Sequence, residues 1–126
     1  MSFSGLKTAV INHLSNARQR GETVNRADVA ASFQYAVNTI LSDKAVRAAV
    51  ENGHGVLALA GGVSANRNLR EMLAEKSQRR GIRFYCPDFK YCTDNGAMIG
   101  SAAFYLLMQG HIADLSFNAV PYLPIA

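Results

Sequence analysis

The sequence predicts an α/β fold, rich in helix, with a small parallel β-α-β unit at its centre. Residues Val56 to Ala60 are continuously apolar, which is typical of a strand buried on both faces of a parallel sheet. A helical pattern follows from about Ala65 to Arg80, and Gly81 ends it. A second short run, Ile82 to Cys86, stops at Pro87. Strand, helix and strand in this order predict two parallel strands joined by a right-handed crossover.

Helices are expected on both sides of this unit. Apolar residues at helical spacing near the start of the chain predict a first helix, which Gly21 ends. Asn25, with Asp28 three residues later, opens a longer helix that ends at Gly53. The apolar stripe of that helix is interpreted as core: Val29, Phe33, Val37, Ile40 and Leu41.

A last helix is expected from Thr93 or Asp94, either of which could cap it, to about Gln109. Two strands are few for the number of helices around them. Another chain, or a longer protein of which this is a part, is therefore expected to complete the sheet.

The composition is that of one globular domain, residues 1–126. The chain is 49% hydrophobic and 17% charged, with a formal net charge of +4. This positive excess suits a polyanionic partner but does not demand one. The start of the chain has no secretion-signal pattern, and the most apolar stretch, residues 97–108, is too short to span a bilayer. We therefore expect a soluble, cytoplasmic protein that does not enter membranes.

The first candidate site follows the first strand. Gly61 and Gly62 lie where ligands bind in open α/β sheets, and glycines let a phosphate or sugar approach the backbone. Asn66, at the helix entry, offers an amide that can donate to or accept from a ribose hydroxyl or phosphate oxygen. The alternative is a tight turn with Ser64 as a helix cap. The pattern alone leaves both interpretations open.

The second candidate is Asp94, at the start of the last helix. A carboxylate in this position is usually a cap, and becomes a metal ligand only where other ligands converge on it. The three histidines, His13, His54 and His111, are isolated and are interpreted as surface residues. A basic group around the end of the central helix is interpreted first as a solvated face, with RNA contact as the alternative: Lys76, Arg79, Arg80 and Arg83.

Four segments together carry a family resemblance. They are SFSGLKTAV (2–10), DVAASFQYAV (28–37), LAGGVSANRNLR (59–70) and CPDFKYCTDNGAMIG (86–100). In this order they resemble the tRNA threonylcarbamoyladenosine transferase family, once described as O-sialoglycoprotein endopeptidases. GGVSAN and CTDNGAMIG are the most specific motifs. The resemblance implies an actin-like fold of the sugar kinase and heat-shock ATPase class, a ribonuclease H-like architecture with two lobes around a cleft.

The resemblance also implies an activity and site residues. Members transfer threonylcarbamoyl from threonylcarbamoyl-AMP to N6 of the adenosine next to the tRNA anticodon, with a bound iron or zinc ion. By motif, Asn66 contacts the adenylate, Asp94 is one metal ligand, and Gly61 and Gly62 line the nucleotide side of the cleft. No general base is identified. The implied partners are tRNA, a paralogous actin-like subunit, an ATPase subunit and the synthase that makes the adenylate.

The chain departs from the family in two respects, the first being that the family's earlier nucleotide-contacting segments have no counterpart here. The family's histidine pair, H-x-x-x-H, has no counterpart here, so the resemblance covers roughly the last third of the enzyme. We expect the chain alone to bind metal weakly or not at all, to be inactive, and to self-associate through its apolar last helix. The alternative is a stand-alone nucleotide-binding or scaffold module of a related actin-like family. A peptidase lacks support, because no H-E-x-x-H motif or nucleophile–base pair is present.

Overall fold

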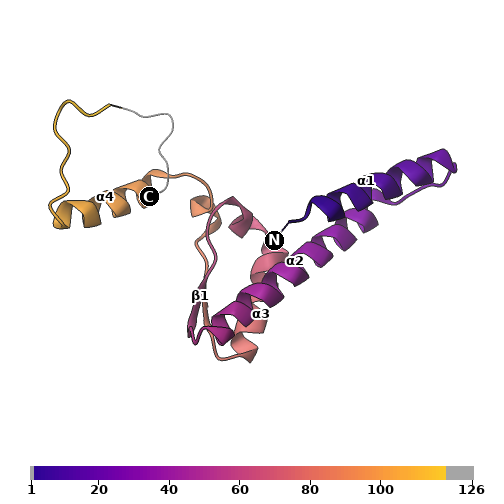
Figure 1. Cartoon of the computed structure of the whole chain (residues 1–126), viewed down its shortest axis with the longest axis horizontal. Helices are drawn as coiled ribbons and strands as arrows, with labels where there is room; N and C mark the ends of the chain where they lie inside the picture. Colours follow the sequence, from indigo (N-terminus) through magenta and orange to yellow (C-terminus); the bar gives the residue numbers. More distant parts are fainter. Residues whose placement is uncertain (1, 119–126) are drawn as a thin grey trace. The chain divides into compact units, whose positions relative to one another are not determined.

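The structure is a computed structural model and describes residues 2–118 (Figure 1). It divides into two compact units, Met1–Cys92 and Thr93–Ala126, which are described separately. The elements of the first are α1 (Ser4–Gln19), α2 (Arg26–Glu51), β1 (Val56–Ala58), the 3₁₀ turn η1 (Gly62–Ala65), α3 (Arg67–Arg79), β2 (Arg83–Tyr85) and the 3₁₀ turn η2 (Phe89–Tyr91). The second contains α4 (Gly96–Met108).

The predicted β-α-β unit is present. β1 and β2 pair in parallel, with Val56 opposite Arg83 and Ala58 opposite Tyr85, and α3 connects them. The helix-rich α/β class is therefore confirmed. Each strand has only three residues, fewer than the apolar runs suggested, because pairing stops where the chain turns away at Gly61 and Pro87.

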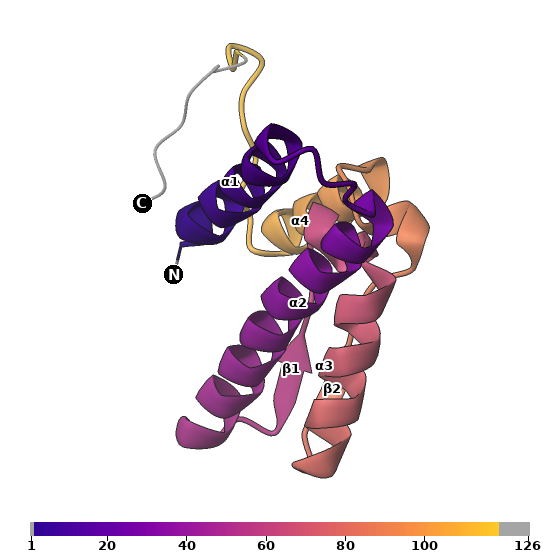
Figure 2. The same cartoon turned by 90° about the vertical axis from the view of Figure 1, so that its right-hand side faces the viewer.

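The core lies between the strands and two helices. α2 and α3 run side by side along one face of the sheet (Figures 1 and 2). Leu57 and Phe84, the middle residues of the strands, pack against this core. Its buried members come from both helices and the residue before β2: Val46, Ala49, Leu69, Leu73 and Ile82.

The prediction that the first strand is buried on both faces is wrong for this chain. Val56 is 42% exposed and Tyr85 is 55% exposed. These side chains alternate with Leu57 and Phe84, so they point away from the helices. Among the described residues, helices cover one face of the sheet. The other face also carries apolar side chains, but no described helix covers it.

The helix ends are set by short polar side chains and glycines. Asn25 caps α2 as predicted, because its Oδ1 accepts the backbone N–H of Ala27 at 3.0 Å. For the last helix the prediction is wrong: Asn95, not Thr93 or Asp94, is the cap, and its Oδ1 accepts the N–H of Met98 at 3.0 Å. This assignment leaves the Asp94 carboxylate outside the cap.

The apolar stripe of α2 is only partly core. Its second half packs against α3, whereas Phe33 is 36% and Ile40 is 40% exposed. α4 is exposed along its whole length, including the large side chains of Ile99, Phe104 and Leu107. No helix within residues 2–118 combines the length and the apolarity that crossing a membrane requires. Self-association through α4 stays a prediction.

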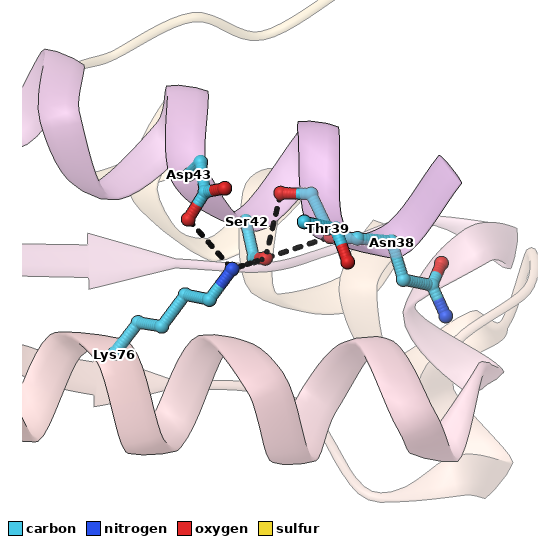
Figure 3. Close-up of polar contacts among 5 residues, drawn as sticks. All are labelled: Asn38, Thr39, Ser42, Asp43 and Lys76. Atoms are coloured by element: carbon cyan, nitrogen blue, oxygen red, sulfur yellow. Dashed lines mark hydrogen bonds and ion pairs between the residues drawn. The ribbon is translucent and has the colours of Figure 1, made fainter. Parts of the chain in front are cut away.

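A polar contact joins α2 and α3 inside this packing (Figure 3). Lys76 Nζ lies 2.8 Å from Ser42 Oγ and 2.6 Å from Asp43 Oδ1. Ser42 Oγ in turn donates to the carbonyl of Asn38 at 2.7 Å. Lys76 was expected to face water, but its side chain is only 24% exposed. The ammonium therefore fixes the spacing of the two helices at a half-buried position.

Two fully buried serines provide a test of this packing. Ser42 Oγ has partners, whereas Ser77 Oγ has no hydrogen-bond partner among the described residues. A buried hydroxyl without a partner is unfavourable, so Ser77→Ala should leave the free energy of unfolding unchanged or raise it by up to about 1 kcal/mol. Ser42→Ala should lower it by about 1–2 kcal/mol. Urea unfolding of both variants measures this, and a loss for Ser77→Ala equal to that of Ser42→Ala would contradict it.

Candidate functional site

The turn after β1 has a backbone that requires glycine at one position. Gly61 has φ 80° and ψ 179°, a region that only glycine adopts without strain. It precedes η1, and its carbonyl accepts both the N–H of Ser64 at 2.9 Å and the Ser64 hydroxyl at 2.6 Å. Gly62 has no positive φ, and a Cβ atom built there meets nothing within 4 Å. The turn conformation therefore explains Gly61 but not Gly62.

Asn66, not Ser64, caps α3. Its Oδ1 accepts the backbone N–H of Leu69 at 3.0 Å, while Ser64 bonds within the turn. The tight-turn alternative is thus correct that a side chain caps the helix, but the capping residue is Asn66 and not Ser64. Oδ1 also accepts from Nδ2 of the buried Asn38 at 3.3 Å. The acceptor of the Asn66 amide is occupied from two sides.

The donor of the Asn66 amide is held much more weakly. Nδ2 lies 3.4 Å from Oε1 of Gln34, a long hydrogen bond to an exposed side chain. Asn66 also lines one end of a groove of about 660 Å³ between α1 and α2. Most of its other lining residues are apolar, including Val10, Leu14 and Phe33. An oxygen of a ligand in this groove could replace Gln34 as the partner of Nδ2.

Asp94 lies in the second unit, in the segment before α4, and is exposed. None of the four ion pairs within residues 2–118 includes it. Because Asn95 caps the helix, the Asp94 carboxylate is free to bind something else. Gly61, Gly62 and Asn66 share one turn of the first unit, and Asp94 belongs to the other unit.

The described residues do not make up a metal site. Within residues 2–118 no three His, Cys, Asp or Glu side chains come together as ligands for an ion. Stable sites for iron or zinc use at least three protein ligands. Asp94 fits the role of one ligand, and this chain's described part does not supply the rest of the set.

One residue of the site was missed by the sequence analysis. Arg70 is not among the candidate residues named from the sequence, but it is half-buried and donates to the carbonyl oxygens of Ser64 and Pro87. Its position four residues after Asn66 places it on the same face of α3 as that cap. This spacing was the available signal. Two members of the basic group form ion pairs instead: Lys76 pairs with Asp43, and Arg79 pairs with Glu75.

Comparison with known proteins agrees with these motifs. A family model described as tRNA N6-adenosine threonylcarbamoyltransferase (TsaD) matches residues 1–101. A relative of that name from Caldicellulosiruptor saccharolyticus is 50% identical over 124 residues, which is 98% of this chain and 37% of the relative. One from Moorella thermoacetica is 51% identical over 124 residues, 98% of this chain and 36% of that protein. One from Desulfitobacterium hafniense is 50% identical over 125 residues, which is 99% of this chain and 37% of that protein.

The chain spans little more than a third of the length of these curated relatives. The match nevertheless includes the turn with Gly61, Gly62 and Asn66, and also Asp94, because all four lie within the residues that the family model covers. The resemblance first seen in four short motifs extends over nearly the whole chain. The chain therefore belongs to the tRNA N6-adenosine threonylcarbamoyltransferase family.

Proposed function

We propose that this chain forms the nucleotide-binding part of an enzyme that transfers threonylcarbamoyl from threonylcarbamoyl-AMP to N6 of an adenosine next to the anticodon in tRNA. The names of the relatives support tRNA adenosine as the acceptor. The observation that carries the nucleotide role is the turn from Gly61 to Asn66. It combines an open backbone with an amide that lines an apolar groove and whose donor makes only a long hydrogen bond to Gln34.

The residues of this turn suit an adenylate in three ways. Gly62 has no side chain to block a phosphate or ribose from the backbone. The amino end of α3 attracts negative charge, since its first N–H groups and its dipole point there. Asn66 Nδ2 can donate to a ribose hydroxyl or phosphate oxygen. The groove between α1 and α2 has the size and apolar walls of a small-molecule site, and we place the adenine there.

Substitutions at the two glycines distinguish effects on the turn conformation from effects on ligand binding. Gly61→Ala should lower the free energy of unfolding by about 1–3 kcal/mol, because alanine is strained at φ 80°. Gly62→Ala should leave stability within about 0.5 kcal/mol and still weaken adenylate binding, because the new methyl occupies the space of the ligand. Thermal unfolding and titration with AMP measure the two effects. Unchanged AMP affinity for Gly62→Ala would place the nucleotide elsewhere.

We propose Asp94 as one ligand of an iron or zinc ion whose other ligands lie outside the described residues. No catalytic step is assigned to the ion here. Asp94→Asn in a full-length enzyme should reduce the bound metal, with affinity lower by about tenfold or more, because metal affinity depends on the number of charged ligands. Asp88→Asn, at another exposed carboxylate of the same region, is the control. Elemental analysis after dialysis gives the metal content, and equal content in both variants would remove Asp94 from the site.

The proposed activity can be tested in a chimera. This chain replaces the matching 124 residues of the Caldicellulosiruptor saccharolyticus relative, and modification of tRNA is measured with the accessory proteins of that organism. We expect the chimera to modify tRNA and the isolated chain to be inactive, since it spans 37% of that relative. A chimera that folds cooperatively and binds AMP without modifying tRNA would favour the stand-alone nucleotide-binding module instead.

A further inference from the structure

Arg70 joins two segments that are far apart in the sequence. Its Nε donates to the carbonyl of Ser64, inside the turn after β1. Its Nη2 donates to the carbonyl of Pro87 at 2.7 Å, just after β2. Both strands end at this side of the sheet because they are parallel. One side chain therefore links the turn of the proposed site to the end of the neighbouring strand.

The same guanidinium makes three further contacts with the segment after β2. Nη2 lies 3.0 Å from Sγ of Cys92, and Nη1 lies 3.5 Å from Sγ of Cys86. The carbon at its centre is 4.2 Å from the ring centroid of Phe89. Carbonyls and sulfurs thus surround the edge of the guanidinium plane, and an aromatic ring covers one face. This arrangement uses the rigid fork of arginine, which lysine cannot reproduce.

Arg70 has no acidic partner among the described residues. None of the four ion pairs within residues 2–118 involves it, and its side chain donates to two carbonyl oxygens and two cysteine sulfurs. An arginine that served only to hold the fold together could equally use a carboxylate. Here an uncompensated cation lies against the turn that is proposed to bind an adenylate, and its charge favours an anion there.

We propose that Arg70 is a positioning residue for the nucleotide site. It holds the Gly61–Asn66 turn against the segment from Cys86 to Cys92, which leads in the sequence directly to Thr93 and Asp94. This inference rests on the proposed function, because it assigns Arg70 a role in adenylate binding. The role is indirect: Arg70 sets the place of the Ser64 carbonyl, and through the turn that of Asn66.

The test compares Arg70→Ala, Arg70→Lys and the control Arg79→Ala in the chimera. Arg79 is on the same helix, but it is exposed and bonds only to Glu75 among the described residues. We expect both Arg70 variants to raise the KM for threonylcarbamoyl-AMP by about tenfold or more, with the KM for tRNA unchanged. Arg79→Ala should change neither. A wild-type KM in Arg70→Lys would show that charge alone suffices and would overturn the positioning role.

A second measurement tests the contact between Arg70 and Cys92 directly and does not depend on enzyme activity. Cys86 is exposed and Cys92 is buried, so a thiol reagent should label Cys86 rapidly and Cys92 slowly in the 126-residue chain. Loss of the contact from Arg70 to Cys92 should make Cys92 label rapidly in both Arg70 variants, and not in Arg79→Ala. Slow labelling of Cys92 in every variant would show that Arg70 does not hold this segment, and the inference would be wrong.

Titration with AMP separates this inference from the proposed function. If the wild-type chimera binds AMP and both Arg70 variants bind it more weakly, both proposals are supported. If all three bind AMP equally, the positioning role fails and the nucleotide site stands. If the wild type does not bind AMP, the proposed function itself is wrong, and the positioning role is wrong with it.

Discussion

Asn66→Asp is expected to lower the affinity for adenylate about 100-fold and to leave the fold intact. Aspartate caps a helix as well as asparagine does, so the bond to the Leu69 N–H is kept. The donor Nδ2 is lost and a negative charge takes its place beside the phosphate. A hydrogen bond to a charged oxygen contributes about 1.5–3 kcal/mol, so with the added repulsion the affinity should fall about 100-fold.

Asn66→Ala is the matched variant, because it removes the cap as well as the donor. It should bind adenylate weakly and also lose about 1 kcal/mol of stability, which Asn66→Asp keeps. Calorimetric titration of the chimera with AMP and urea unfolding of the 126-residue chain measure the two quantities. If Asn66→Asp binds AMP as the wild type does, Asn66 serves only as a cap, and the interpretation of the turn as a nucleotide site loses its main residue.

Leu69→Ala is expected to cause the largest loss of stability. Leu69 is 2% exposed and lies where α3 packs on α2. Truncating a buried leucine costs about 3 kcal/mol, a large share of the stability of a small core, and should lower the melting temperature by roughly 10 °C. The second unit has its own helix, so the change should fall on the unit that contains the turn.

The control for Leu69 is Ile11→Ala. Ile11 is 55% exposed on α1, so its truncation should change the free energy of unfolding by no more than about 0.5 kcal/mol. Thermal unfolding followed by circular dichroism compares the two variants. Similar melting temperatures for both would mean that Leu69 is not part of the stabilising core.

Periodicity and end signals were enough to predict the helices and the parallel unit. The Asn25 cap, the glycine after each helix and the apolar runs are local signals, and they act locally in the structure as well. The burial of α2 and the first strand was overestimated for a different reason. Phe33 and Val56 are apolar and yet 36% and 42% exposed, because the spacing of residues within one element does not encode which other element covers a side chain.

The candidate residues of the site could be predicted from the sequence, but the part that each side chain plays could not. The glycines and Asn66 stand out in the sequence, yet their hydrogen bonds decide which atom of Asn66 remains available, and those bonds involve Asn38 from another helix. For Arg70 the spacing from Asn66 indicates a shared helix face, but it does not indicate which groups Arg70 contacts. Its partners Ser64, Pro87 and Cys92 meet only because the two strands are parallel.

The different conformations of the two adjacent glycines predict different evolutionary constraints on them. Gly61 is required by the backbone of any descendant that keeps the turn, whether or not it still handles a nucleotide. Gly62 has no positive φ and open space around it, so only the proposed ligand would constrain it. In a lineage that retained the fold and lost the ligand, selection would preserve the first glycine while the second drifted to alanine or serine. Under the proposed function, comparison of the two positions among descendants would show which of them still bind the nucleotide.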